Sequence, residues 1–186
     1  MTAIASRTDA VASGATGRFS RFLIIFFIAA AASFQLLPAY AARFEGKVVG
    51  LSDGDTITVL SRDQVQYKIR LAGIDAPEKR QAYGDKSRAH LASLVFGKWV
   101  AVDWTKRDRY GRILGKVSVA GQDVCLEQIR NGMAWHYKKY AADQDWSDRS
   151  LYAAAERDAV RDRRGLWGDA APVPPWGFRS NGRHPT

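Results

Sequence analysis

The stretch DGDTITVLSRDQVQYKIRLAGIDAPE, residues 53–78, decides the fold that we expect of this chain. Its opening Asp-Gly-Asp is typical of a turn, because glycine and aspartate adopt tight backbone geometry at little cost. Apolar and polar residues then alternate over residues 56–60 and again over residues 65–71. Alternation with a period of two, bounded by turn residues, indicates two half-buried strands that pair as a hairpin. Gly73 and Pro77 end the second strand.

This hairpin would bring carboxylates from its two ends together. Asp55 stands before the first strand, and Asp75 and Glu78 follow the second. Because a hairpin begins and ends at the same end of its sheet, we expect the carboxylates of Asp55 and Asp75 to lie close together. Paired carboxylates in this position predict a metal site.

Three motifs carry a resemblance to a known family. DGDT at residues 53–56, IRLAGIDAPE at 69–78 and DRYGR at 108–112 resemble, in this order, the signature segments of the staphylococcal nuclease (thermonuclease) family. The resemblance covers roughly residues 44–167. It implies an OB-fold, a five-stranded β-barrel with about three α-helices packed around it. The residue pattern alone indicates only the α+β class.

The resemblance also implies roles for individual residues. The positions that match the family's calcium ligands are Asp55, Asp75 and Ala76. The positions that match its catalytic residues are Arg70, Glu78 and Arg112. Ala76 stands where the family commonly has threonine, which is a mild change if this ligand acts through its backbone carbonyl.

The chemistry of these side chains suits hydrolysis of a phosphodiester. An oxygen-only ligand set favours a hard cation, calcium or alternatively magnesium, with waters and the phosphate completing its shell. The planar forks of Arg70 and Arg112 can hold phosphate oxygens in a bidentate way. Glu78 is left to accept a proton from water or to orient it. Each residue taken singly is more often a turn residue or a solvated charge, but the ordered set favours an active site.

We therefore expect a thermonuclease-like hydrolase, an endonuclease that cleaves DNA and RNA with little sequence preference. By the resemblance, water attacks phosphorus, the 5′-oxygen leaves and a 3′-phosphate remains. The alternative is a non-catalytic OB-fold module that only binds nucleic acid at the cell envelope. Three carboxylates facing a polyanion would not help such a module. A third possibility is an anchored envelope protein whose positive charge binds anionic lipid headgroups.

Aromatic and basic side chains alternate in two places outside the carboxylate stretch. Such a mixture can stack bases and follow a phosphate backbone. The candidate nucleic-acid-binding residues are Arg109, Tyr110, Tyr137, Lys138 and Tyr140. The competing interpretation is that Trp135 and Tyr137 only pack on the barrel.

Composition is consistent with this function without deciding it. The 186 residues suit one domain, and 28 basic residues against 19 acidic ones give a formal net charge of +9. A basic surface favours nucleic acid or an anionic membrane, although it can also serve solubility alone. The single cysteine, Cys125, excludes an intrachain disulfide and a thiolate zinc site, and we expect it to be a packed core residue. We expect a monomer without an obligate protein partner.

The termini are expected to differ from the nuclease domain at residues 42–168. Residues 1–41 combine a basic leader, an apolar run at 22–37 and an Ala-x-Ala site, which together are typical of a secretory signal peptide. A retained membrane anchor is the alternative, and either one predicts export to the periplasm or beyond. Residues 169–186 are rich in proline, and we expect them to form an extended tail anchored by Trp176 and Phe178.

Periodicity, strand-forming runs and helix-capping residues together predict the remaining elements. Further strands are expected at residues 44–49, 99–104 and 113–119, and helices at 83–96, 123–129 and 147–164. Asp123 is the expected cap of the second helix. Leu151, Ala155 and Ala159 are expected to lie on one face of the third.

Overall fold

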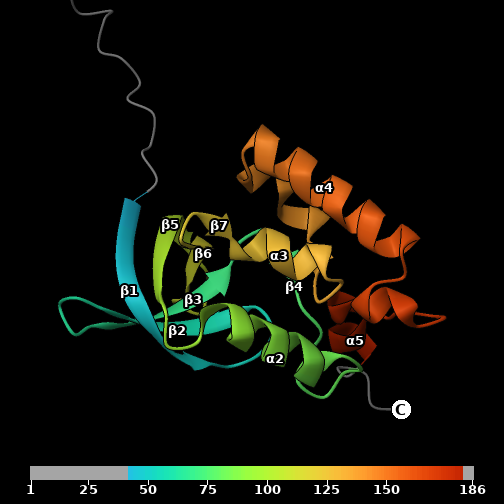
Figure 1. Cartoon of the computed structure of the whole chain (residues 1–186), viewed down its shortest axis with the longest axis horizontal. Coiled ribbons are helices and arrows are strands. Elements are labelled where there is room, and N and C mark those ends of the chain that lie inside the picture. Colours follow the sequence, from blue (N-terminus) through green and yellow to red (C-terminus); the bar gives the residue numbers. More distant parts are fainter. Residues whose placement is uncertain (1–41, 182–186) are drawn as a thin grey trace, which may run out of the picture. The chain divides into compact units, whose positions relative to one another are not determined.

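The computed structural model describes residues 42–181, and residues 1–41 and 182–186 lie outside the described part (Figure 1). The predicted signal peptide or anchor falls on residues that are not described. Within residues 42–181, the helices are too short or too polar to cross a bilayer.

Within the described residues, five strands close into a barrel. They are β1 (Ala42–Leu51), β2 (Thr56–Ser61), β3 (Gln66–Leu71), β5 (Trp99–Arg107) and β6 (Ile113–Val119). The strands follow the order β3-β2-β1-β5-β6, and a parallel pairing between β3 and β6 joins the two ends (Figure 1). This closed barrel with its helices confirms the predicted α+β class and the OB-fold.

Three helices follow at the predicted places: α2 (Gly84–Val95), α3 (Val124–Arg130) and α4 (Trp146–Arg161). The Asp123 carboxylate accepts a hydrogen bond from the Leu126 N–H at 3.1 Å, which confirms the predicted cap of α3. The shorter elements were not predicted. They are β4 (Ile74–Asp75), β7 (Gln122–Asp123), β8 (Trp135–His136), the 3₁₀ turns η1 (Lys138–Asp143) and η2 (Gly165–Gly168), and helix α5 (Pro175–Asn181).

The C-terminal third shows two features that the sequence did not indicate. On α4, Leu151 is half exposed, whereas Ala155, Ala159 and the large Tyr152 side chain are buried. The Tyr152 hydroxyl donates to Asp123 at 2.8 Å, so its polar group is satisfied inside the protein. The tail is not simply extended, because α5 begins at Pro175, a residue whose fixed φ suits the first helical position.

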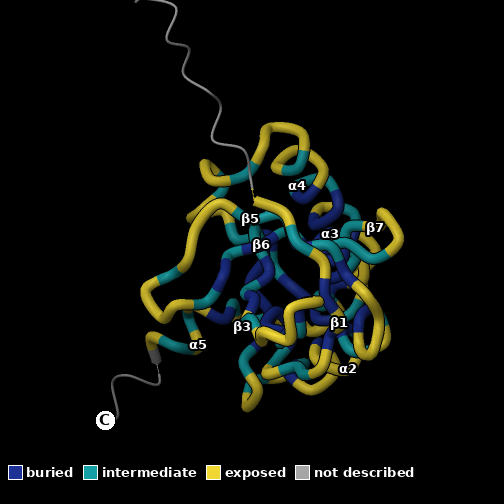
Figure 2. The backbone as a smooth tube through the Cα atoms, turned by 90° about the vertical axis from the view of Figure 1, so that its left-hand side faces the viewer, coloured by how far each residue is buried: buried dark blue, intermediate teal, exposed yellow. Residues whose placement is uncertain are grey.

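The hydrophobic core lies inside the barrel and beneath α2 and α3 (Figure 2). Inward residues of neighbouring strands, such as Ile57, Ile69 and Val102, are fully buried, as the alternating pattern predicts. Cys125 is buried among them, which confirms its predicted packing role. Burial raises the pKa of the Cys125 thiol to about 12, so it stays neutral and unreactive at physiological pH.

A small ribbon outside the barrel fixes the exit of the hairpin. Strand β4 pairs antiparallel with β8, which places Asp75 opposite Trp135. The Tyr137 N–H extends this pairing by donating to the Gly73 carbonyl at 2.9 Å. The backbone that carries Asp75 is therefore held by a segment some sixty residues further along the chain.

Candidate active site

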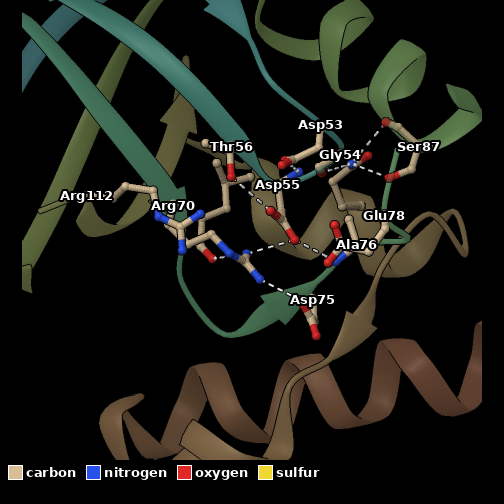
Figure 3. A network of polar contacts seen from close by, with 12 residues as sticks. Asp53, Gly54, Asp55, Thr56, Arg70, Asp75, Ala76, Glu78, Ser87 and Arg112 are labelled. Atoms are coloured by element: carbon tan, nitrogen blue, oxygen red, sulfur yellow. Dashed lines mark hydrogen bonds and ion pairs between the residues drawn. The ribbon is translucent and has the colours of Figure 1, made fainter. Parts of the chain in front are cut away.

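The Asp-Gly-Asp turn is pressed against helix α2. A Cβ atom on Gly54 would lie 1.9 Å from Ser87 Oγ and 2.9 Å from the Ala76 Cβ, so only glycine fits without a shift. The buried Gln128 amide donates to the Gly54 carbonyl at 2.7 Å. The Asp55 N–H donates to the Asp53 carboxylate at 3.0 Å. These contacts fix the turn and aim the Asp55 side chain into the molecule (Figure 3).

Arg70 joins the two carboxylates that the hairpin was expected to bring together. Its Nη1 lies 2.9 Å from Asp55 Oδ2, and its Nη2 lies 2.7 Å from Asp75 Oδ1 (Figure 3). The β2–β3 register places Arg70 opposite Thr56, beside the turn that carries Asp55. The predicted proximity of Asp55 and Asp75 is therefore confirmed, because one guanidinium reaches both.

Asp55 is almost completely buried, at 5% exposure. Desolvation by burial raises its pKa to about 8, and the positive charge of Arg70 opposes this rise. The Ala76 N–H donates to Asp55 Oδ2 at 2.7 Å, and the Thr56 hydroxyl donates to Oδ1 at 3.1 Å. Ala76 thus contacts Asp55 through its backbone, which a change from threonine to alanine leaves intact.

The donor set fits a hard divalent cation with few protein ligands. Asp55 and Asp75 offer carboxylate oxygens, and the positive charge that lies between them is the Arg70 guanidinium. Within the described range, no group of three or more His, Cys, Asp or Glu side chains is close enough to hold a metal. Two carboxylates therefore suit an ion that takes its other ligands from backbone, water and phosphate oxygens.

Glu78 lies in the loop between β4 and α2, next to the buried pair. Its side chain is 35% exposed, so water can reach the carboxylate. The Gln81 side chain holds the loop by accepting a hydrogen bond from the Glu78 N–H at 3.1 Å. Glu78 is thus a solvent-accessible base beside two buried acids.

Arg112 is held by the turn between β5 and β6. The Asp108 carboxylate accepts bonds from the N–H groups of Tyr110 and Arg112 at 2.9 and 3.0 Å, and from Arg112 Nε at 2.7 Å. Partial burial tends to raise the pKa of Asp108, but these hydrogen bonds outweigh it and hold the pKa below its ordinary value. Asp108 therefore stays ionised and orients Arg112, which lies on the Arg70 side of the cluster (Figure 3).

The predicted nucleic-acid-binding residues fall in two groups. Arg109 lies over the ring of the exposed Tyr110, with its guanidinium carbon 4.8 Å from the ring centroid. Tyr137 contacts the Tyr140 ring at 5.1 Å. Lys138 forms an ion pair with the buried Glu156.

The structure adds one residue that the sequence motifs did not indicate. Arg179 of α5 binds Asp75 and Glu78, with contacts of 2.7 and 2.6 Å. It stands 104 residues beyond Asp75 and follows a proline-rich segment, so no local pattern marks it. Only the fold brings it to the carboxylates.

Comparison with known proteins identifies the family. The family model described as staphylococcal nuclease homologue matches residues 68–169. An uncharacterized endonuclease of Escherichia coli is 46% identical over 144 residues, which are 76% of this chain and 89% of that protein. An uncharacterized endonuclease of Haemophilus influenzae is 42% identical over 133 residues, 72% of this chain and 71% of that protein. A micrococcal nuclease of Shigella flexneri is 40% identical over 159 residues, 81% of this chain and 88% of that protein.

The chain therefore belongs to the staphylococcal nuclease family, as its three motifs predicted. The prediction of a hydrolase of the nuclease class is confirmed with it. The family is metal-dependent, and its substrates are nucleic acids. The matched segment includes Arg70, Asp75, Glu78 and Arg112, whereas Asp55 and α5 lie outside it.

Proposed function

We propose that this protein hydrolyses DNA and RNA in a calcium-dependent reaction with little sequence preference, leaving 3′-phosphate ends. The observation that carries the proposal is the Arg70 bridge. One guanidinium holds two buried carboxylates, one just before the first strand of the hairpin and one just after its second strand. A third carboxylate, Glu78, lies beside them. A protein that only binds nucleic acid gains nothing from acids collected at its phosphate-binding surface.

Asp55, Asp75 and the Ala76 carbonyl are the proposed ligands of the cation. When bound, the ion would neutralise phosphate charge and so reduce the repulsion between the diester and a nucleophile. Magnesium is the alternative ion, because the same oxygen donors suit it. The burial of both carboxylates supports this assignment, since two buried acids carry more negative charge than the single Arg70 guanidinium between them offsets.

The two arginines of the site would bind the non-bridging phosphate oxygens. Arg70 is nearly buried, with a side chain 12% exposed, so its charge acts in a medium that screens it weakly. Asp108 occupies Nε and Nη2 of Arg112, and within residues 42–181 no hydrogen bond engages Nη1. That nitrogen is available to a phosphate oxygen, where it would stabilise charge that builds in the transition state.

Glu78 would act on the attacking water. As a half-exposed carboxylate it can accept the proton of a water molecule or orient it toward phosphorus. Two groups of residues would contact the bases and backbone of the substrate. One is the exposed pair Arg109 and Tyr110, and the other, later in the chain, is Tyr137, Lys138 and Tyr140.

We place this reaction outside the cytoplasm. The support is the sequence of residues 1–41, with its basic leader, apolar run and Ala-x-Ala site. N-terminal sequencing of the exported protein separates the two forms. A mature chain beginning near residue 42 supports a cleaved signal, and retention of residues 22–37 supports a membrane anchor.

A cleavage assay tests the proposed reaction. Full-length protein is incubated with single- and double-stranded DNA and with RNA, in chelator, in a calcium series and in a magnesium series. We expect cleavage of all substrates with calcium, none in chelator, and 3′-phosphate termini in the mapped products. Cleavage that persists in chelator, or substrate binding without any cleavage, would contradict the proposal.

A further inference from the structure

The C-terminal helix α5 reaches into the candidate active site. Arg179 Nη2 lies 2.7 Å from Asp75 Oδ2, and Nη1 lies 3.3 Å from Asp75 Oδ1 and 2.6 Å from Glu78 Oε1. Arg70 also binds Asp75 Oδ1. Both oxygens of the Asp75 carboxylate are therefore bonded to guanidiniums, and the proposed base Glu78 is neutralised by one of them.

The same helix covers an aromatic ring of the proposed substrate surface. Trp176 stacks on Tyr137, with ring centroids 5.5 Å apart and ring planes inclined by 18°. It also meets the edge of Trp135 at 5.6 Å. A parallel stack is the arrangement that a nucleic-acid base would make with a tyrosine. Trp176 therefore takes the place that a base would need on Tyr137.

The segment before α5 is fastened to the loop that carries Glu78. The Gln81 amide donates to the Val173 carbonyl at 2.5 Å, and the Gln81 carbonyl oxygen accepts from the Glu78 N–H. Three groups of contacts thus dock residues 173–179: this hydrogen bond, the aromatic stack and the Arg179 ion pairs.

This docking does not involve the hydrophobic core. In the described chain, no α5 residue belongs to the core cluster. Trp176 and Phe178 are 39% and 38% exposed. Helix α5 also lies beyond residue 169, where the match to the family model ends. The helix can therefore leave the site without opening the barrel.

We propose that α5 is an autoinhibitory cover, in which Arg179 competes with the divalent cation for Asp75 and Trp176 competes with a base for Tyr137. The cover rests on the proposed function, because it concerns the same ligands and the same ring. Arg70 already uses Asp75 Oδ1 and Arg179 takes Oδ2, so the docked helix leaves no oxygen of this carboxylate without a guanidinium. A cation gains Oδ2 only when Arg179 withdraws, so cation binding and α5 docking oppose each other. By linkage, a bound cation weakens α5 docking by the same factor by which docking weakens cation binding.

Calcium binding in the absence of nucleic acid tests this competition. Calorimetric titration of the full-length chain is compared with Arg179→Ala, Arg179→Lys and Trp176→Ala. We expect Arg179→Ala to bind calcium roughly tenfold more tightly, within the usual range of coupling between two sites. Arg179→Lys should gain less, because lysine keeps the charge and loses only the bidentate geometry. Arg161→Ala, which removes an exposed arginine of α4, should leave the affinity unchanged.

Trp176→Ala separates a docked helix from a simple effect of local charge. This variant removes no charge, so it tightens calcium binding only if the aromatic stack holds Arg179 in place. Equal calcium affinity in wild type and Trp176→Ala, or in wild type and Arg179→Ala, overturns the cover. Far-ultraviolet circular dichroism establishes that each variant is folded.

Cleavage at limiting calcium completes the test. The cover predicts that Arg179→Ala cleaves at least as fast as wild type there. Loss of cleavage at saturating calcium would instead make Arg179 part of the reaction and overturn the proposal. If no form of the protein cleaves nucleic acid but the calcium affinities follow the predicted order, the proposed function fails and the competition for Asp75 stands.

Discussion

Arg70 is the residue on which the charge balance of the site depends. Its guanidinium is the shared partner of Asp55 and Asp75, which are 5% and 0% exposed. Removing one partner of a buried ion pair leaves an uncompensated charge in a medium that solvates it poorly.

Arg70→Ala should therefore lower the free energy of unfolding by about 3 kcal/mol in the presence of chelator. Calcium should restore part of this loss, because the ion supplies positive charge to the same carboxylates. Urea denaturation with and without calcium measures both effects. Arg62→Ala is the control, since its ion pair with Glu45 is exposed and should be worth less than about 1 kcal/mol. If Arg70→Ala unfolded with the same urea midpoint as the wild-type protein, the Arg70 bridge would not stabilise the fold.

Glu78 and Arg112 should matter for the reaction more than for the fold, because both are partly exposed. Glu78→Gln and Arg112→Ala should each lower kcat by about two to three orders of magnitude, the usual cost of removing one group that stabilises the transition state. Initial rates at saturating calcium measure this. Glu127→Gln, a change to a partly exposed carboxylate of α3 that pairs with Arg130, is the control. Near-normal rates for Glu78→Gln would exclude Glu78 from acting on the water.

At the residue scale, the motifs indicated which groups gather but not all of their contacts. The meeting of Asp55 and Asp75 was predicted because strand alternation determines where a hairpin begins and ends, whereas Arg70 was indicated by the family resemblance of its motif. Arg179 could not be predicted, since its contact with Asp75 spans 104 positions and depends on the path of a proline-rich segment. The backbone contact of Ala76 with Asp55 was also invisible in the sequence, because an N–H group is common to all residues except proline.

At the scale of elements, the Asp-Gly-Asp turn and α2 are packed too closely to tolerate a side chain at residue 54. Gly54→Ala should lower the free energy of unfolding by about 1–3 kcal/mol, the typical cost of overpacking. The reason is that the new Cβ would lie 2.8 Å from the Ser87 Cβ and 2.9 Å from the Ala76 Cβ. It should also weaken calcium binding, because a shift of the turn moves Asp55.

Gly50→Ala is the matched control for this substitution. A Cβ at residue 50 would lie 3.6 Å from Thr58, which is an ordinary contact distance. Urea denaturation and calcium titration of both variants measure the difference. Equal stability of the two would mean that the turn can move away from α2 without cost.

Long periodic elements were predictable, and short ones were not. The barrel strands, α2 and α4 repeat a period several times, and the Asp123 cap marked the start of the shorter α3, so these elements could be predicted. Strands β4 and β8 have two residues each, too few for any period to show. The burial of Tyr152 in α4 was not predicted either, because its hydroxyl is satisfied by Asp123, which lies 29 positions earlier in the chain. The residue pattern of α4 itself carries no information about that distant partner.

At the scale of the whole molecule, closure of the barrel depends on the parallel pairing of β3 with β6. The paired residues Ile69 and Ile113 are far apart in the chain, and the strand pattern alone supported only the α+β class. The prediction that the five strands close into an OB-fold barrel came from the family resemblance of the three motifs. The barrel thereby places the Arg112 turn beside the hairpin that carries Arg70.

The formal net charge of +9 predicts that substrate binding is sensitive to salt. Binding of a labelled single-stranded oligonucleotide should weaken at least about tenfold between 50 and 200 mM salt, because phosphate contacts release counterions. Fluorescence anisotropy with the Glu78→Gln variant in calcium measures this without cleavage. Sucrose at equal osmolality is the control. An affinity that does not change with salt would mean that phosphates are not the main contacts.

The central claim is that Asp55 and Asp75 hold one cation between them. A calcium binding isotherm of the full-length protein, compared with Asp55→Asn and Asp75→Asn, tests it most directly, with the exposed Asp63→Asn as control. We predict one ion per chain, a loss of affinity of more than about tenfold in each site variant, and no change in the control. A wild-type isotherm for either site variant would contradict the claim.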